Sequence, residues 1–77
     1  MPKVRVYTTP VCPWCERVKQ FLREHGVEFE EVNVMEDRKA AIEMIEKSGQ
    51  MGVPVIEIDG QIVVGYNPER LKELLKL

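Results

Sequence analysis

Residues 4–15, VRVYTTPVCPWC, decide the fold of this chain. Apolar and polar side chains alternate over Lys3–Thr8, which predicts a strand, and Pro10 ends that pattern. From Pro13 onward, apolar residues recur at three- and four-residue spacing until Gly26, which predicts an amphipathic helix. The two cysteines therefore lie where a strand gives way to the N-terminus of a helix.

A hairpin is the clearest local pattern in the second half of the chain. Two apolar runs, Val55–Ile58 and Gln61–Val64, flank Asp59-Gly60, and an Asp-Gly pair supplies the positive φ angles of a two-residue type I′ turn. A shorter alternating segment, about Phe29 to Asn33, predicts one further strand. Together with the first segment, these patterns give four strands.

Two further amphipathic segments predict helices. Asp37 can cap the first, which ends at Ser48-Gly49, and Asn67 can cap the second, with Pro68 at its first position. Their apolar stripes consist of Ala40, Ala41, Met44 and Ile45 in one and of Leu71, Leu74 and Leu75 in the other. In the helix after the cysteines, the residues expected on the side away from the core are Arg17, Lys19, Gln20, Arg23 and Glu24.

The order strand, helix, strand, helix, strand, strand, helix predicts an α/β fold. A right-handed crossover would join the first two strands in parallel, and the hairpin would add antiparallel strands. We therefore expect a four-stranded mixed sheet in the order 2-1-3-4, covered by three helices. Residues 1–77 are expected to form a single domain, because a chain of this length supports one modest core.

Composition excludes several classes of partner. The net charge is −2 and no basic run is present, so nucleic acid is not expected as a partner. Residues 1–5 do not read as a signal peptide, and no apolar run is long enough to cross a membrane. Small domains of oxidising compartments usually carry several disulfides, whereas this chain has two cysteines. We expect a cytoplasmic monomer that does not bind membranes.

Cys12-Pro13-Trp14-Cys15 is the motif that carries chemistry. At a helix N-terminus, unpaired N–H groups and the macrodipole favour a thiolate at Cys12, and only a thiolate attacks a disulfide. Cys15 lies one helical turn later, where it can attack the Cys12 sulfur of a mixed disulfide and release the reduced product. Pro13 and Trp14 limit the bend of the loop and cover the pair.

Other roles for two cysteines remain open at this stage. A structural zinc site needs four ligands, and His25 is the only histidine, so one chain cannot complete such a site and no metal is expected. An iron–sulfur or metal carrier would need a second subunit to share the metal. A redox-inert binding module would keep its function without either thiol.

The motif, together with Gly52-Val53-Pro54 at the start of a strand and Gly65 before the last helix, resembles glutaredoxin-like proteins of the thioredoxin-fold superfamily. The resemblance covers essentially the whole chain. It implies a dithiol oxidoreductase without a bound cofactor, which acts on disulfide-containing proteins and takes electrons from glutathione. In that family the proline matching Pro54 is cis and the backbone of the preceding residue pairs with the substrate. The residues alone are equally compatible with a trans proline.

Three positions depart from the pattern of glutathione-using members. Thr9 stands where many carry a lysine, Met51 stands near a family arginine, and Gly65-Tyr66-Asn67 lacks their aspartate. The run from Gly65 to Pro68 is instead similar to the redoxins that serve ribonucleotide reductase and are reduced by thioredoxin reductase. The resemblance thus implies substrate-binding roles for Val53, Pro54, Gly65 and Tyr66 and leaves two possible reductants.

Overall fold

The elements follow one another in the predicted order in this computed structural model, which describes residues 3–77. They are β1 (Val4–Thr8), α1 (Pro13–Glu24), β2 (Glu30–Asn33), α2 (Arg38–Ser48), β3 (Val55–Ile58), β4 (Gln61–Val64) and α3 (Pro68–Leu75). β1 and β2 each begin one residue later than expected. Met1 and Pro2, which open the segment considered as a signal peptide, lie outside the described residues.

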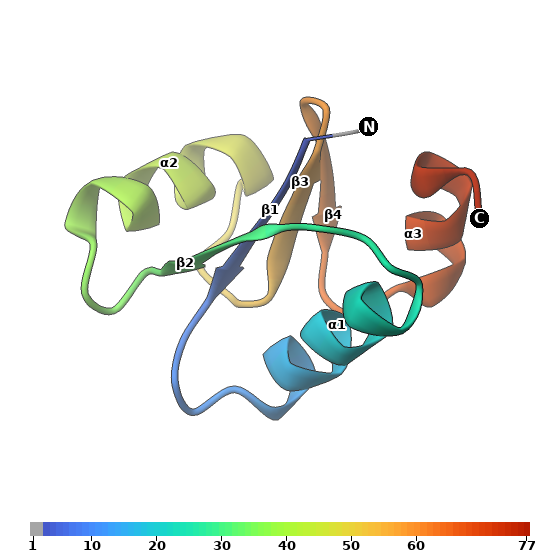
Figure 1. The fold of residues 1–77 in the computed structure, drawn as a ribbon. Helices are drawn as coiled ribbons and strands as arrows, with labels where there is room; N and C mark the ends of the chain where they lie inside the picture. The colour runs from blue at the N-terminus through green and yellow to red at the C-terminus, as the bar shows by residue number, and fades with distance from the viewer. Residues whose placement is uncertain (1–2) are drawn as a thin grey trace.

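The sheet has the predicted order β2-β1-β3-β4 (Figure 1). β1 runs parallel to β2 and antiparallel to β3, so that Val6 lies beside both Glu31 and Ile56. β3 and β4 form the antiparallel hairpin. The prediction of a mixed α/β sheet is therefore confirmed. None of the helices within residues 3–77 has the length and apolar character needed to cross a bilayer.

The hairpin turn has the geometry that its two residues predict. Asp59 has φ 47° and Gly60 has φ 86°, as a type I′ turn requires. Glycine is the residue that adopts the second of these angles at no steric cost. The register Ile58 opposite Gln61 follows directly from this two-residue loop.

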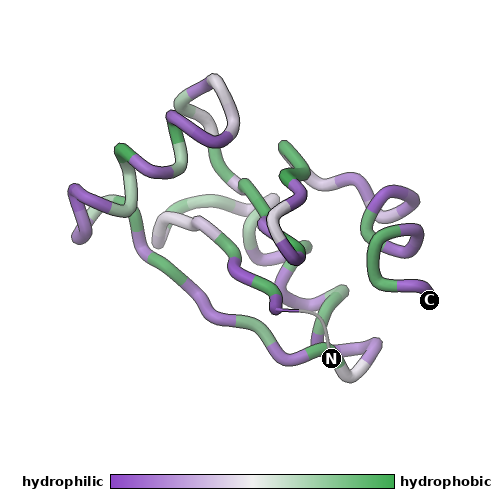
Figure 2. The backbone as a smooth tube through the Cα atoms, turned by 90° about the horizontal axis from the view of Figure 1, so that it is seen from above, coloured by the Kyte–Doolittle hydropathy of each residue, from purple (hydrophilic) through white to green (hydrophobic). Residues whose placement is uncertain are grey.

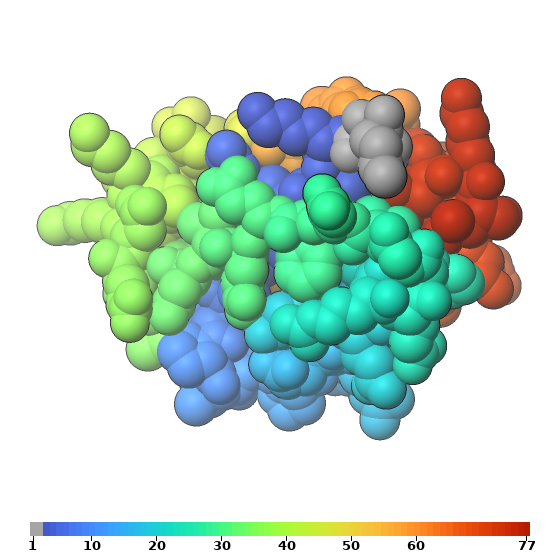
Figure 3. Space-filling view, viewed as in Figure 1, coloured from blue at the N-terminus to red at the C-terminus, as the bar shows by residue number. Residues whose placement is uncertain are grey.

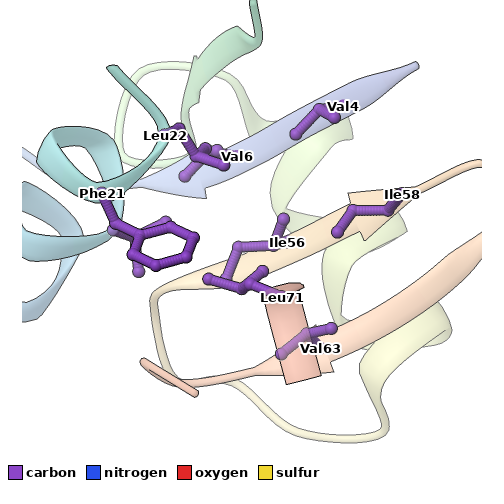
Figure 4. Close-up of a cluster of buried hydrophobic side chains, with 9 residues drawn as sticks. Val4, Val6, Phe21, Leu22, Ile56, Ile58, Val63 and Leu71 are labelled. Carbon is purple, nitrogen blue, oxygen red and sulfur yellow. The ribbon is translucent and has the colours of Figure 1, made fainter. Parts of the chain in front are cut away.

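Helices cover both faces of the sheet, and each face has its own core cluster. α1 and α3 cover one face, where side chains from three strands meet Phe21, Leu22 and Leu71 (Figure 4). α2 covers the other face, where Ala40 and Met44 pack on Tyr7 and Val55 of the sheet. Along the chain, hydrophobic and hydrophilic residues alternate (Figure 2). Successive side chains of a strand point to opposite faces, so Val6 lies in the cluster under α1 and α3 and Tyr7 in the cluster under α2.

The caps of the later helices agree with the sequence. Asp37 accepts a hydrogen bond from the Ala40 amide at 3.0 Å, and Asn67 accepts one from the Arg70 amide at 3.1 Å. Each bond satisfies one N–H group that lacks an intrahelical partner. Leu71, near the start of α3, is fully buried.

Two expectations about helix faces are wrong. Lys19 was expected on the solvent side of α1, but it is only 7% exposed, because β2 runs alongside and its ammonium group pairs with Glu31 and Glu16 at 2.7 Å each. The carboxylates satisfy the charge, so the lysine stem can be covered. Ile45 was expected in the apolar stripe of α2 and is instead exposed, since the cluster on that face is already closed by Ala40 and Met44.

Candidate active site

Cys12 is the residue that caps α1. Its backbone is extended, with φ −113° and ψ 104°, and Pro13 opens the helix. Its sulfur accepts a hydrogen bond from the Cys15 amide at 3.1 Å. This places the sulfur at the positive end of the helix dipole, where negative charge is stabilised. The β1–α1 loop and α1 together form the lower edge of the molecule in Figure 3.

The two cysteines form a disulfide, with their Cα atoms 5.2 Å apart. Cys12 is partly exposed, whereas Cys15 is 0% exposed beneath it. An incoming disulfide can therefore reach the first sulfur but not the second. The pair has the asymmetry expected of an attacking thiol and a resolving thiol.

Trp14 and Tyr66 form an aromatic wall beside the disulfide motif. Trp14 is 55% exposed, and its ring lies 6.1 Å from that of Tyr66 at an interplanar angle of 29°. Tyr66 also meets Phe21 edge-on at 6.4 Å, so its ring both packs on the core and lines the surface. The guanidinium of Arg17 lies 5.2 Å from the centre of the Trp14 ring, within the range of a cation–π contact.

A pocket of about 280 Å³ joins this wall to the loop before β3. It is lined by Trp14, Val53, Pro54, Gly65 and Tyr66. The Val53–Pro54 peptide bond is cis, as the resemblance implied. Gly65 donates its amide hydrogen to the Pro54 carbonyl at 2.8 Å, which ties the two sides of the pocket together. The structure thus brings together the residues for which the family resemblance implied substrate binding.

The lining of this pocket contains no charged side chain. Thr9 is half-buried, and Met51 is 78% exposed. A larger hollow of about 620 Å³, lined by residues such as His25, Phe29 and Leu75, shares no residue with the site and holds no cysteine. The small uncharged pocket adjoins the Cys12–Cys15 motif through Trp14, whereas the larger hollow is lined by none of the residues of that motif.

The side chains around the cysteines determine whether one chain could hold a metal ion. Within residues 3–77, no three His, Cys, Asp or Glu side chains lie close enough together to hold a metal ion. The buried position of Cys15 leaves only one of the two cysteine sulfurs accessible. A metal held here would therefore need ligands from a second chain.

Sequence reasoning missed one residue at the edge of the site. Gln50 lies in the loop between α2 and β3, and its side-chain amide bonds to both backbone groups of Gly52. A loop has no periodicity that would mark such a residue. The one signal in the sequence was that Gln50 stands two residues before Gly52, which directly precedes Val53-Pro54.

Comparison with known proteins gives the family. The model of the Glutaredoxin family matches residues 4–63. A glutaredoxin-like 8.6 kDa protein of the rubredoxin operon in Clostridium pasteurianum is 44% identical over 73 residues, which cover 95% of this chain and 97% of that protein. Glutaredoxin 3 of Escherichia coli is 40% identical over 65 residues, with 84% of this chain and 78% of that protein covered.

Two further comparisons bear on fold and subtype. The crystal structure of a glutaredoxin from Archaeoglobus fulgidus superimposes with a TM-score of 0.88 at 35% identity, covering 100% of this chain and 89% of that one. The glutaredoxin-like protein NrdH of Lactococcus lactis is 32% identical over 71 residues, covering 92% of this chain and 97% of that protein. With its thioredoxin-like fold and its Cys12–Cys15 pair, the chain belongs to the glutaredoxin family and is a thiol–disulfide oxidoreductase.

Proposed function

We propose that this protein reduces protein disulfides and mixed disulfides by a dithiol mechanism, with Cys12 as nucleophile and Cys15 as resolving thiol. One observation carries the assignment of roles: Cys12 is partly exposed and caps α1, whereas Cys15 is fully buried. Only the first sulfur can meet a substrate, and it lies where a thiolate is stabilised.

The proposed reaction has two exchanges. The Cys12 thiolate attacks one sulfur of the substrate disulfide, the substrate S–S bond breaks, and the departing thiolate takes up a proton. Cys15 then loses its proton and attacks the Cys12 sulfur, which breaks the mixed disulfide and releases the second substrate thiol after protonation. Two electrons and two protons pass to the substrate, and the chain is left with the Cys12–Cys15 disulfide seen here.

The small pocket is the proposed substrate site. Trp14 and Tyr66 offer flat apolar contact, and Val53 offers backbone groups beside the cis proline. Apolar contact and main-chain pairing suit an extended polypeptide around its disulfide. A single chain carries both thiols and the pocket, so a monomer suffices. The cytoplasm is the proposed compartment, because dithiols there are kept reduced.

A second candidate concerns the source of electrons. Glutathione carries two carboxylates and an ammonium group, yet the pocket lining is uncharged, Thr9 stands at the position of a family lysine and Met51 stands near that of a family arginine. This lining favours a redoxin that is reduced by thioredoxin reductase. The redoxin subtype is represented among the relatives by the glutaredoxin-like protein NrdH of Lactococcus lactis.

The test is a coupled disulfide-reduction assay with two reductant systems. Glutathione with glutathione reductase is compared with NADPH and thioredoxin reductase, using wild type, Cys12→Ser and Cys15→Ser. We expect turnover in wild type, none in Cys12→Ser, and a stable mixed disulfide with substrate in Cys15→Ser that mass spectrometry detects. Turnover with only one system identifies the reductant.

Other outcomes would contradict the proposal. Activity that survives in Cys12→Ser would show that Cys12 is not the nucleophile. If wild type is inactive in both systems, the protein is purified without oxygen and examined for colour and dimerisation. A coloured dimer would identify a metal or iron–sulfur carrier.

A further inference from the structure

In the loop before β3, the side-chain amide of Gln50 forms the pair of hydrogen bonds with the backbone that a neighbouring strand would form. The Gln50 Oε1 atom accepts from the Gly52 amide at 2.7 Å, and its Nε2 donates to the Gly52 carbonyl at 2.9 Å. Both backbone groups of Gly52 are therefore occupied by a single side chain. Such a closed pair restricts rotation on both sides of the Gly52 Cα atom.

The close approach leaves no room for a side chain at residue 52 while the Gln50 amide stays in place. A Cβ atom on Gly52 would lie 2.7 Å from Gln50 Oε1, which is too short for a contact between non-bonded atoms. The Ser48 hydroxyl lies 3.0 Å from the Gln50 carbonyl oxygen and 2.6 Å from that of Met44. Gln50 is thus tied to the end of α2 on one side and to Gly52 on the other.

This arrangement fixes the backbone of Val53 from both directions. Gly52 is held before it, and after it the Pro54 carbonyl accepts from the Gly65 amide at 2.8 Å. The Val53 side chain packs on the cluster beneath α2. Within residues 3–77, neither the N–H nor the C=O group of Val53 takes part in a hydrogen bond. These two groups are held in place and free at the rim of the pocket.

We propose that Gln50 is a positioning residue. It fixes Gly52 and thereby holds the free backbone groups of Val53 where they pair with the main chain of a polypeptide that carries a disulfide. The proposal rests on the function proposed above, because it assumes that Val53 meets substrate. Gln50 itself touches no reacting atom. Its contribution is to reduce the loop entropy that substrate binding would otherwise have to remove.

The proposal predicts that changes in this loop affect two kinds of disulfide substrate differently. A peptide with one internal disulfide has main-chain groups that can pair with Val53. Bis(2-hydroxyethyl) disulfide has no main chain, so its reduction does not require the backbone pairing at Val53. Loosening the loop should therefore weaken binding of the first substrate and leave the second unaffected.

The experiment uses pre-reduced protein in single-turnover reactions with each disulfide, so no reductase is needed. Gln50→Met removes both hydrogen bonds to Gly52 together with the longer one, 3.4 Å, from Nε2 to the Ser48 hydroxyl, and Gln50→Glu keeps the acceptor but loses the donor. Gln61→Glu, at the far end of β4, is the control for the added charge. For the peptide, we expect the half-saturating concentration to rise roughly three- to tenfold in both Gln50 variants, at an unchanged limiting rate.

Two further measurements keep the test independent of folding defects. Gly52→Ala should displace the Gln50 amide and give the same selective effect, and combining it with Gln50→Met should add little further loss. Hydrogen exchange of the Gly52 amide should accelerate in the Gln50→Met variant.

The outcomes are distinct. Unchanged peptide kinetics in the Gln50 variants would overturn the inference, and so would an equal loss with both disulfides, which would indicate a general structural role. Wild type that reduces neither disulfide would overturn the proposed function itself and the inference with it.

Discussion

Cys12 combines a structural task with its chemical one. Helix caps are usually Ser, Thr, Asp or Asn, whose oxygen accepts from the backbone of the first turn. Here the Cys12 sulfur takes that place, with the Cys15 amide at 3.1 Å. A thiolate is the stronger acceptor, because hydrogen bonds to charged acceptors are stronger than those to neutral ones. The cap therefore favours the state that attacks disulfides.

Tyr66 is the residue whose ring should matter more than its hydroxyl. The ring lies beside those of Trp14 and Phe21, whereas no side-chain hydrogen bond within residues 3–77 involves its hydroxyl. We expect Tyr66→Ala to lower the free energy of unfolding by about 2 kcal/mol and to weaken peptide binding. Tyr66→Phe should stay within about 0.5 kcal/mol of wild type. Urea denaturation and single-turnover kinetics measure the two effects, and equal losses in both variants would assign the role to the hydroxyl.

Residues that act through local geometry could be predicted from the sequence. Asp59-Gly60 requires positive φ angles wherever it forms a two-residue turn, and Cys12 followed by proline marks a helix start. Gln50 could not be predicted, because its role depends on a contact within an irregular loop. The cis state of Pro54 likewise followed from family resemblance and not from the residues alone.

At the scale of elements, α1 is joined to β2 by a charged side chain. Lys19 donates to Glu31 of β2 and pairs with Glu16 of its own helix. Helical periodicity placed Lys19 on the solvent side, because periodicity describes one helix and contains no information about a neighbouring edge strand. Only the tertiary arrangement brings Glu31 beside it.

The Lys19 ion pairs predict a pH-dependent contribution to stability. Hydrogen bonds that Lys19 donates to Glu16 and then to Glu31 hold the pKa of Lys19 above its ordinary value, and the Lys19 contact holds the pKa of Glu16 below its own. Stability from a raised lysine pKa is complete below about pH 10.4 and is lost as the pH rises through the folded value. Stability from a lowered glutamate pKa is present above about pH 4.3 and is lost as the pH falls through the folded value.

We therefore expect Lys19→Met to destabilise the protein by about 1 kcal/mol near neutral pH. The methionine keeps an apolar stem of similar length, so the loss reports the ion pairs. Urea denaturation from acid to alkaline pH should show the difference from wild type shrinking at both extremes. Lys72→Met, at an exposed position on α3, is the matched control and should change little. A difference that does not vary with pH would assign the effect of Lys19 to packing.

At the scale of the whole molecule, the sheet separates two core clusters. β1 is central, so both of its faces are buried: Val6 faces the cluster under α1 and α3, and Tyr7 faces the cluster under α2. The Tyr7 hydroxyl is satisfied by Lys47 at 3.4 Å, which permits its complete burial. Alternation in the sequence predicted β1 as a strand, but α2 had to be placed before Tyr7 could be identified as a core residue.

Leu71 is the fully buried residue of α3, and Leu74 and Leu75 pack beside it on the same cluster. It is 0% exposed and packs in the cluster shared by α1, β1, β3 and β4, whereas Leu77 at the end of the chain is 52% exposed. Leu71→Ala should lower the free energy of unfolding by roughly 2–5 kcal/mol, because it leaves a cavity that the sheet cannot close. Leu77→Ala should change it by less than about 0.5 kcal/mol. In urea denaturation, the slope of the free energy against urea should be the same for both variants if α3 unfolds with the sheet.

A small loss in Leu71→Ala with a reduced slope would mean instead that α3 detaches on its own. Tyr66 directly precedes α3, so such detachment would also release one wall of the substrate pocket.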